Sequence, residues 1–180
     1  GASLIQATVL SEYTGGSTGT ALAFVSSVLD LEFTAVFSDA FSDSKRHAME
    51  AFGANVLGEK SADGTITPEL IQRMKSRAYS LASRPGWFYP DQFGSPDVRK
   101  GYEPMGLEIA QDLGEHVDVL VAAVGTGAAL MGTMDGLEKV GVSPDIIALE
   151  RLQSPLLTTG KGGPHKVEGV GVGFEPPFLD

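Results

Sequence analysis

The sequence contains no cysteine, which excludes disulfide bonds, thiolate metal sites and cysteine nucleophiles. Histidines are also scarce, and His47, His116 and His165 lack the i, i+4 spacing of zinc ligands on a helix, so no metal site is expected. There is no run of about 18 apolar residues, and no basic segment followed by an apolar one opens the chain. We therefore expect neither a membrane span nor export, and we expect a cytoplasmic protein.

Basic residues are also few in comparison with acidic ones. Thirteen lysines and arginines stand against 23 aspartates and glutamates, which gives a formal net charge of −10. A chain with this charge repels the phosphate backbone of nucleic acid and the surface of an anionic membrane, so neither is an expected partner. The length of 180 residues and the hydrophobic share of 42% can supply the core of one domain or two small ones.

Strand and helix patterns alternate along the first 150 residues. Apolar segments of strand character occupy 7–10, 33–37, 55–57, 117–124 and 146–149, and helical spacing covers 21–29, 44–52, 70–81, 97–113 and 130–137. The continuous apolar run at 117–124 is typical of a parallel strand that is covered on both faces. The alternation predicts an α/β fold with doubly wound parallel sheets in three layers. The last thirty residues hold six glycines and four prolines and are too irregular to build a core of their own.

Two glycine-rich turns stand between a predicted strand and a predicted helix, where such sheets bind ligands. Backbone N–H groups at a helix start suit carboxylate or phosphate. In Thr14–Gly19 the hydroxyls of Thr14, Ser17 and Thr18 add donors for a small carboxylate, and Gly125–Ala129 allows close approach of a phosphate. Two structural alternatives stay open, namely a tight turn with a serine cap at the first loop and a close strand-to-helix junction at the second.

The second loop also invites a dinucleotide-binding interpretation. Glu150 ends the next predicted strand about 25 residues further on, where a ribose-binding acid would stand. However, Gly127 is followed by two alanines and a leucine, so the complete G-x-G-x-x-G pattern is absent. A lone G-x-G is a weak indication of dinucleotide binding.

Five stretches, in the same order, resemble the cysteine synthase and tryptophan synthase β group of fold type II pyridoxal-phosphate (PLP) enzymes. These stretches are 14–23, 49–56, 91–93, 124–127 and 162–174. The resemblance covers essentially the whole chain. It implies a partial two-domain architecture, in which 1–95 is the small cofactor-covering domain and 96–180 is part of the large PLP-binding domain.

The resemblance also implies roles for individual residues. The substrate-binding residues would be Thr14, Gly16, Ser17, Thr18 and Gln92, and the cofactor-binding residues would be Gly125, Thr126, Gly127, Gly169 and Gly171. Two positions depart from the family pattern. Ser17 stands where asparagine is common, and Ala129 replaces a hydroxyl residue that often completes the phosphate site.

A third departure concerns the lysine that holds the cofactor covalently in this family. That lysine lies well before the carboxylate loop, and no lysine precedes Thr14 here, so covalent attachment of PLP is not expected in this chain. We expect the lysines that are present to be solvated surface charges; they are Lys45, Lys60, Lys75, Lys100, Lys139, Lys161 and Lys166.

The resemblance implies part of a cysteine synthase-like enzyme, truncated at both ends, that catalyses β-elimination or β-replacement on a small amino acid. Without the lysine the chain is expected to be inactive alone, and whether it is itself an enzyme stays open. The alternatives are a non-catalytic module that binds an amino acid or phosphate, and a folded oligomeric remnant. The apolar, glycine-rich tail favours a homo-oligomer under each. The apolar strand at 117–124 needs cover on both faces, which a dimer would provide.

Overall fold

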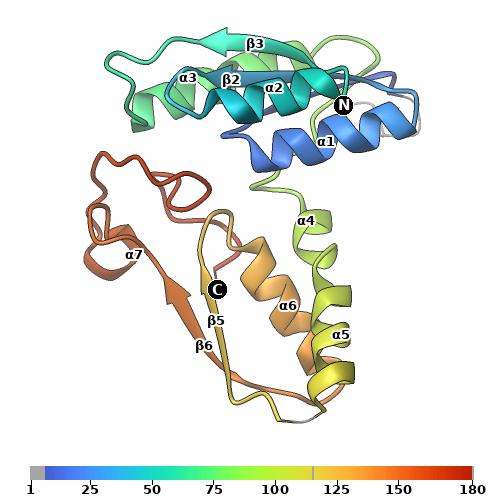
Figure 1. Cartoon of the computed structure of the whole chain (residues 1–180), viewed down its shortest axis with the longest axis vertical. Helices are drawn as coiled ribbons and strands as arrows, with labels where there is room; N and C mark the ends of the chain where they lie inside the picture. The colour runs from blue at the N-terminus through green and yellow to red at the C-terminus, as the bar shows by residue number, and fades with distance from the viewer. Residues whose placement is uncertain (1–6, 115, 180) are drawn as a thin grey trace. The chain divides into compact units, whose positions relative to one another are not determined.

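The computed structural model describes residues 7–114 and 116–179, which form two compact units (Figure 1). The first unit consists of the described residues up to Asp91 together with Pro164–Gly169. The second consists of Gln92–Gly163 and the described residues from Val170 onward. The sequence-based division assigned 164–169 to the second half of the chain, whereas the structure groups this segment with the first.

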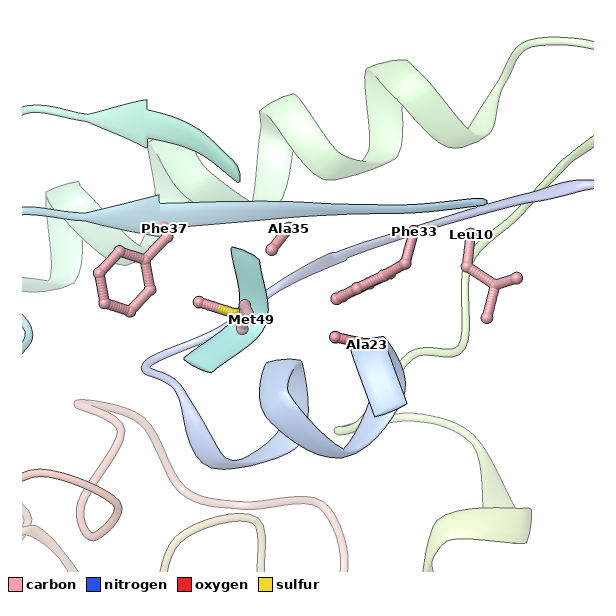
Figure 2. Close-up of a cluster of buried hydrophobic side chains, with 6 residues drawn as sticks. All are labelled: Leu10, Ala23, Phe33, Ala35, Phe37 and Met49. Atoms are coloured by element: carbon pink, nitrogen blue, oxygen red, sulfur yellow. The ribbon is translucent and has the colours of Figure 1, made fainter. Parts of the chain in front are cut away.

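The first unit is built on a four-stranded parallel sheet. Its strands are β1 (Val9–Tyr13), β2 (Glu32–Ser38), β3 (Asn55–Glu59) and β4 (Trp87–Phe88), in the order β3-β2-β1-β4. Its helices are α1 (Ser17–Val28), α2 (Asp43–Ala51) and α3 (Pro68–Ala82). Helices α1 and α2 cover one face of the sheet and α3 covers the other (Figures 1 and 2). The prediction of an α/β fold with helices on both faces of a parallel sheet is confirmed.

The core of the first unit lies between the sheet and helices α1 and α2. Its buried side chains come from two strands and both helices (Figure 2) and are Leu10, Ala23, Phe33, Ala35, Phe37 and Met49. On the opposite face, α3 buries Leu70, Met74 and Ala78, whose i, i+4 spacing places them on one side of the helix. Each large apolar side chain buried here contributes about 1.5–3 kcal/mol relative to exposure.

Side-chain caps define where α2 and α3 begin. Thr67 is the N-cap of α3; its Oγ1 accepts a hydrogen bond from the backbone N–H of Leu70 at 3.3 Å, and Pro68 is in the first turn. The N-cap of α2 is Ser42, whose Oγ accepts from the N–H of Ser44. Both helix starts follow from signals within three residues of the cap.

The second unit combines a two-stranded parallel sheet with helices. The strands are β5 (Val119–Ala123) and β6 (Asp145–Leu149), and the helices are α4 (Pro96–Lys100), α5 (Glu103–Leu113), α6 (Ala128–Glu138) and α7 (Leu156–Thr159). The continuous helix expected over 97–113 is wrong, because the chain turns at Gly101 and Tyr102 and restarts as α5. Pro104 explains the break, since proline has no N–H to continue the helical ladder and its ring collides with the preceding turn.

Strands β5 and β6 are less covered than the sequence suggests. Val119, Val121, Ile147 and Leu149 are 45%, 51%, 47% and 49% exposed. The expectation of a strand covered on both faces is therefore wrong within the described part of the chain. No helix among the described residues is long and apolar enough to cross a membrane.

Candidate functional site

The first glycine loop joins β1 to α1 and is folded around one hydroxyl. The Oγ1 of Thr14 accepts hydrogen bonds from the backbone N–H groups of Gly16 at 3.0 Å and Gly19 at 3.1 Å. The backbone N–H of Thr14 donates to the carbonyl oxygen of Val36 at 3.1 Å, which ties the loop to β2. Thr14 is 2% exposed. Its side chain therefore shapes the loop, whatever part it also takes in binding.

Two glycines make this conformation possible. Gly16 has φ +132°, and a Cβ there would fall 2.1 Å from Cδ of Lys45. At Gly19 a Cβ would fall 2.4 Å from Sδ of Met49. Gly16 is also the N-cap residue of α1 and has no side chain to cap it, so the first-turn N–H of Gly19 is bound by Thr14 instead. The serine-capped turn that the sequence left open is therefore not what forms, because Ser17 is an exposed residue of the first helical turn.

The first turn of α1 also contains no acidic residue. Helix starts carry backbone N–H groups that lack helical partners and a partial positive charge. A helix start that follows a glycine turn and lacks an acidic residue favours an anionic group such as a carboxylate. Thr18, half-buried, and Ser17 stand in this turn, whereas the sequence placed them in the loop before the helix.

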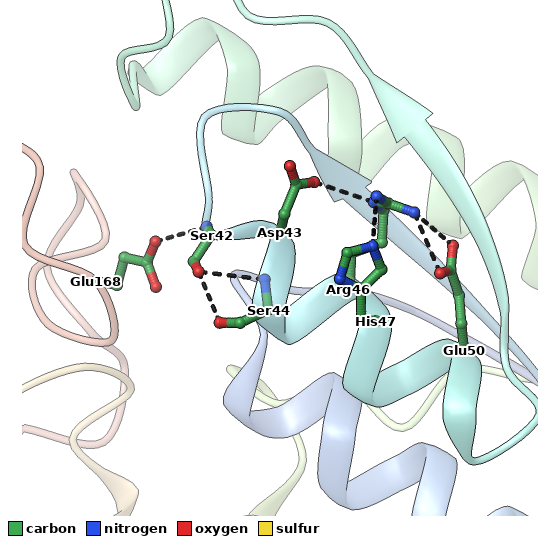
Figure 3. Close-up of polar contacts among 7 residues, drawn as sticks. All are labelled: Ser42, Asp43, Ser44, Arg46, His47, Glu50 and Glu168. Atoms are coloured by element: carbon green, nitrogen blue, oxygen red, sulfur yellow. Dashed lines mark hydrogen bonds and ion pairs between the residues drawn. The ribbon is translucent and has the colours of Figure 1, made fainter.

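A contact with the tail of the chain organises the neighbourhood of this loop. Lys45 Nζ lies 2.9 Å from Oε2 of Glu168, and the side chain of Lys45 is 27% exposed. The other carboxylate oxygen of Glu168 accepts from the N–H of Ser42 at 2.7 Å, at the start of α2 (Figure 3). Lys45 also borders a groove of about 480 Å³, together with Ser17 and Phe24. The expectation that Lys45 is simply a solvated surface charge is therefore wrong.

No pattern in the sequence indicates the cluster of one carboxylate and three phenols that lies beside the first loop. Glu12 and Tyr13, at the end of β1, are 0% and 2% exposed, and the rings of Tyr79 and Tyr89 lie 4.5 Å apart. Burial, followed by the nearby charge of Glu12, raises the pKa of both Tyr13 and Tyr89 far above the usual value for a phenol. Both phenols are therefore neutral at physiological pH.

The second glycine loop joins β5 to α6 and has the same construction. Gly127 is the N-cap of α6, with φ +84° and no side-chain cap, and the first turn of α6 contains no acidic residue. Thr126 Oγ1 accepts from the N–H of Ala128 at 3.2 Å. A Cβ on Gly127 would fall 3.1 Å from Leu179, so the tail packs closely over this turn. The loop combines backbone donors, one hydroxyl and the positive end of α6, a combination that suits a phosphate.

The glycine-rich tail reaches this second loop through Gly171. The N–H of Gly171 donates to the carbonyl oxygen of Val124 at 2.8 Å, directly before Gly125. Gly169, the other residue expected to line the cofactor ring, belongs to the first unit, where a Cβ would meet open space. Gln92 is buried and begins the second unit. Thr14, Gly16, Ser17 and Thr18 thus share one loop of the first unit, and Gly171 joins Gly125, Thr126 and Gly127 in the second.

Glu150 has a structural role that explains its position without a ribose. Its carboxylate accepts hydrogen bonds from the N–H groups of Leu157 and Thr158, each at 2.8 Å. The hydroxyl of Thr158, followed by these backbone groups, holds the pKa of Glu150 below its usual value. The carboxylate of Glu150 is therefore engaged by backbone N–H groups of α7. This weakens the interpretation that it binds a ribose of a dinucleotide.

The fold and the two loops define a class of protein. Parallel strands lead into glycine turns, and each turn opens a helix that has glycine at its N-cap and no acidic residue in its first turn. This is the construction of an α/β protein that binds anionic groups of a small molecule beyond the carboxyl ends of its strands.

Comparison with known proteins narrows this class. The family model of pyridoxal-phosphate dependent enzymes matches residues 4–180. A cysteine synthase of Staphylococcus aureus is 33% identical over 173 residues, which cover 94% of this chain and 53% of that protein. The chain spans about half the length of the curated relatives that it matches.

Solved structures of pyridoxal-phosphate dependent enzymes resemble this chain as well. The O-acetylserine dependent cystathionine β-synthase of Helicobacter pylori is 34% identical with a TM-score of 0.84, and 96% of this chain matches 55% of that one. A hydrogen sulfide-producing enzyme of Fusobacterium nucleatum is 28% identical with a TM-score of 0.83, over 97% of this chain and 58% of the other. The chain belongs to the pyridoxal-phosphate dependent enzymes of fold type II, in the cysteine synthase group. Pyridoxal phosphate is the cofactor that this membership implies.

The residues of the second loop fit the phosphate of this cofactor. Gly127 leaves the start of α6 open, and no carboxylate in its first turn would repel an anion. Ala129 offers no hydroxyl, so the donors of the loop itself are backbone N–H groups and Thr126. The second loop therefore fits a phosphate in its shape and in the sign of its charge. It offers one hydrogen-bond donor fewer than the family pattern.

Proposed function

We propose that this chain provides the substrate-carboxylate loop and the cofactor-phosphate loop of a PLP-dependent enzyme that performs β-elimination or β-replacement on a small amino acid. The observation that carries the proposal is the pair of helix starts with glycine at the N-cap, Gly16 and Gly127, and no acidic residue in the first turn, in a chain that matches this family along its length. One loop suits a carboxylate and the other a phosphate ester.

In this proposal each loop has a separate task. Gly125–Gly127 and the start of α6 hold the phosphate, and Gly171 brings the tail against the same loop. Thr14, Gly16, Ser17 and Thr18 bind the amino-acid carboxylate, which Gln92 helps to hold. The cofactor, when bound, supplies an electron sink for the bond changes at the amino acid.

The proposal includes the absence of a covalent link in this chain. No lysine precedes Thr14, and Lys45, the lysine nearest this loop in sequence, is paired with Glu168. The ion pair gives Lys45 a structural role, in which it joins α2 to the segment that contains Glu168. Turnover by this polypeptide alone is therefore expected to be negligible.

An absorbance titration with pyridoxal phosphate tests the proposal, followed by borohydride reduction and peptide mapping. Saturable binding, without stoichiometric labelling of any one lysine, is the expected result. Specific labelling of Lys45 would show that this lysine replaces the missing one. Failure of wild-type protein to bind the cofactor would contradict the proposed function.

A second candidate is a binding module without chemistry. It is favoured by Ser17 and Ala129, which both offer less to the ligand than the family pattern does. This candidate predicts saturable binding of amino acid or phosphate but no release of a β-substituent, even when a polypeptide carrying the missing family segments is added. Restored turnover in that mixture would favour the enzyme.

A further inference from the structure

Arg151 is a buried guanidinium whose donors are only partly used. It follows β6 and is 8% exposed. Its Nη2 donates to the carbonyl oxygen of Gly171 at 2.8 Å. Its Nε and Nη1 are buried and have no acceptor among the residues that the structure describes. Most of the hydrogen-bonding capacity of this side chain is thus available.

A buried guanidinium with unpaired donors is unfavourable in free energy unless a ligand accepts hydrogen bonds from it. A guanidinium keeps its charge under all ordinary conditions, so it cannot escape burial by becoming neutral. A buried charge without a partner costs several kcal/mol, and buried donors are nearly always satisfied in folded proteins. The buried, largely unpaired guanidinium of Arg151 is therefore suited to binding an anion.

The position of Arg151 indicates where that anion binds. The parallel ladder pairs Ala123 with Leu149, and two residues further along each strand stand Gly125 and Arg151. Gly171 links the two, because its N–H bonds to the carbonyl of Val124 and its carbonyl accepts from Arg151. A Cβ on Gly171 would fall 1.9 Å from Nη2, so the guanidinium lies directly against the Gly171 backbone.

We propose that Arg151 is an oxyanion-binding residue that completes the phosphate site of the Gly125–Gly127 loop. This inference rests on the proposed function, since the phosphate is that of the cofactor. The loop itself provides only partial positive charge from α6 and a single hydroxyl from Thr126. Arg151 adds a full charge at the end of the neighbouring strand and replaces the donor that Ala129 lacks. A substrate carboxylate shares the same chemistry and is the competing source of the anion.

The experiment compares wild-type protein with Arg151→Gln, which keeps an N–H donor for Gly171 but removes the charge. Lys161→Gln, which removes an exposed cation of the same unit, is the matched control. The probes are pyridoxal phosphate, pyridoxal without phosphate, inorganic phosphate and serine, each measured by calorimetry. The melting temperature of each ligand-free protein is recorded in parallel.

Arg151→Gln should weaken pyridoxal phosphate and inorganic phosphate by about 10- to 100-fold, because charge-assisted hydrogen bonds are lost. Pyridoxal and serine should bind the variant and wild type equally. The ligand-free melting temperature should stay unchanged or rise, since the variant no longer buries an unmatched charge. Lys161→Gln should resemble wild type in every measurement.

Equal phosphate affinity in wild type and Arg151→Gln would overturn the inference while leaving the proposed function standing. A selective loss of serine binding would also overturn it, by assigning Arg151 to the substrate carboxylate. A lower ligand-free melting temperature with unchanged affinities would show a purely structural role. If wild-type protein bound neither pyridoxal phosphate nor inorganic phosphate, the inference and the proposed function would both fail.

Discussion

The hydroxyl oxygen of Thr14 accepts the backbone N–H of Gly19 at 3.1 Å, and this bond joins the end of β1 to the first turn of α1. The same oxygen accepts from Gly16, so one buried side chain closes the loop on both sides. A loop of this kind is already shaped before a ligand arrives, which lowers the ordering cost of binding. The side chain that closes it is consequently the first target for mutation.

Thr14→Val is expected to destabilise the first unit by about 1–3 kcal/mol, because valine has the same shape but leaves two buried N–H groups unsatisfied. Urea denaturation monitored by tryptophan fluorescence measures the effect at Trp87, in β4 of the same unit. Thr14→Ser keeps the acceptor and is the control, with a smaller loss. Equal stability of wild type and Thr14→Val would show that the hydroxyl does not hold the loop.

Gly136 is a site where α5 and α6 touch along their backbones. A Cβ there would fall 2.0 Å from the carbonyl oxygen of Glu103, and backbone cannot easily move aside. Gly136→Ala should therefore destabilise the second unit by about 1–3 kcal/mol or more through overpacking. Gly141→Ala is the control, because a Cβ meets open space there and only its φ of +83° is unfavourable, at about 1 kcal/mol. Thermal unfolding followed by circular dichroism ranks the two variants.

The carboxylate of Asp135 makes two hydrogen bonds with Arg99, at 2.6 and 2.8 Å. These bonds, followed by the charge of Arg99, lower the pKa of Asp135. Since the pKa is lower in the folded state, the stabilisation is present above the unfolded value of about 3.9 and is lost as pH falls through the folded value. The melting temperature should decrease when the pH is lowered below about 4. Asp135→Asn should melt lower at neutral pH and show a smaller decrease in acid; an unchanged acid profile would contradict this assignment.

Short-range signals were sufficient to predict much of this structure. The caps at Ser42 and Thr67 and both glycine loops depend on residues within a few positions of each other. Helical spacing on both sides predicts one helix over 97–113, although Pro104 marks the break before α5. The signal for that correction was present in the sequence.

The interactions that the sequence did not reveal join distant segments. Ser42 and Glu168 are 126 positions apart, and Arg151 reaches Gly171 across 20 positions of irregular chain. Neither pair follows a helical or strand period, so no local pattern could have placed them. The loops could therefore be predicted as candidate sites, whereas the charges that adjoin them could not.

Glu168 holds the segment Pro164–Gly169 against α2 within the first unit, and Glu168→Gln should loosen this segment. The change removes the ion pair with Lys45 and weakens the bond to the N–H of Ser42. Because both side chains are about one quarter exposed, the loss of global stability should be only about 0.5–1 kcal/mol. Trypsin should nevertheless cleave faster after Lys161 and Lys166, because cleavage depends on local opening. Glu175→Gln, an exposed acid of the same tail, is the control; equal cleavage rates in both variants would show that Glu168 does not hold the segment.

The exposed strands β5 and β6 make association the final prediction. Val121 and Ile147 are neighbours in the ladder and are 51% and 47% exposed, on strands whose composition is typical of buried sheets. Apolar strand surface of this kind favours burial against another chain, so we expect the purified protein to form a dimer or larger homo-oligomer. Light scattering coupled to size-exclusion chromatography measures its mass. Val121→Lys should shift the population toward monomer, whereas Lys100→Gln, at the exposed end of α4, should not. If the wild-type protein remained monomeric at high concentration, the exposed apolar surface of β5 and β6 would not drive association, and the prediction would be wrong.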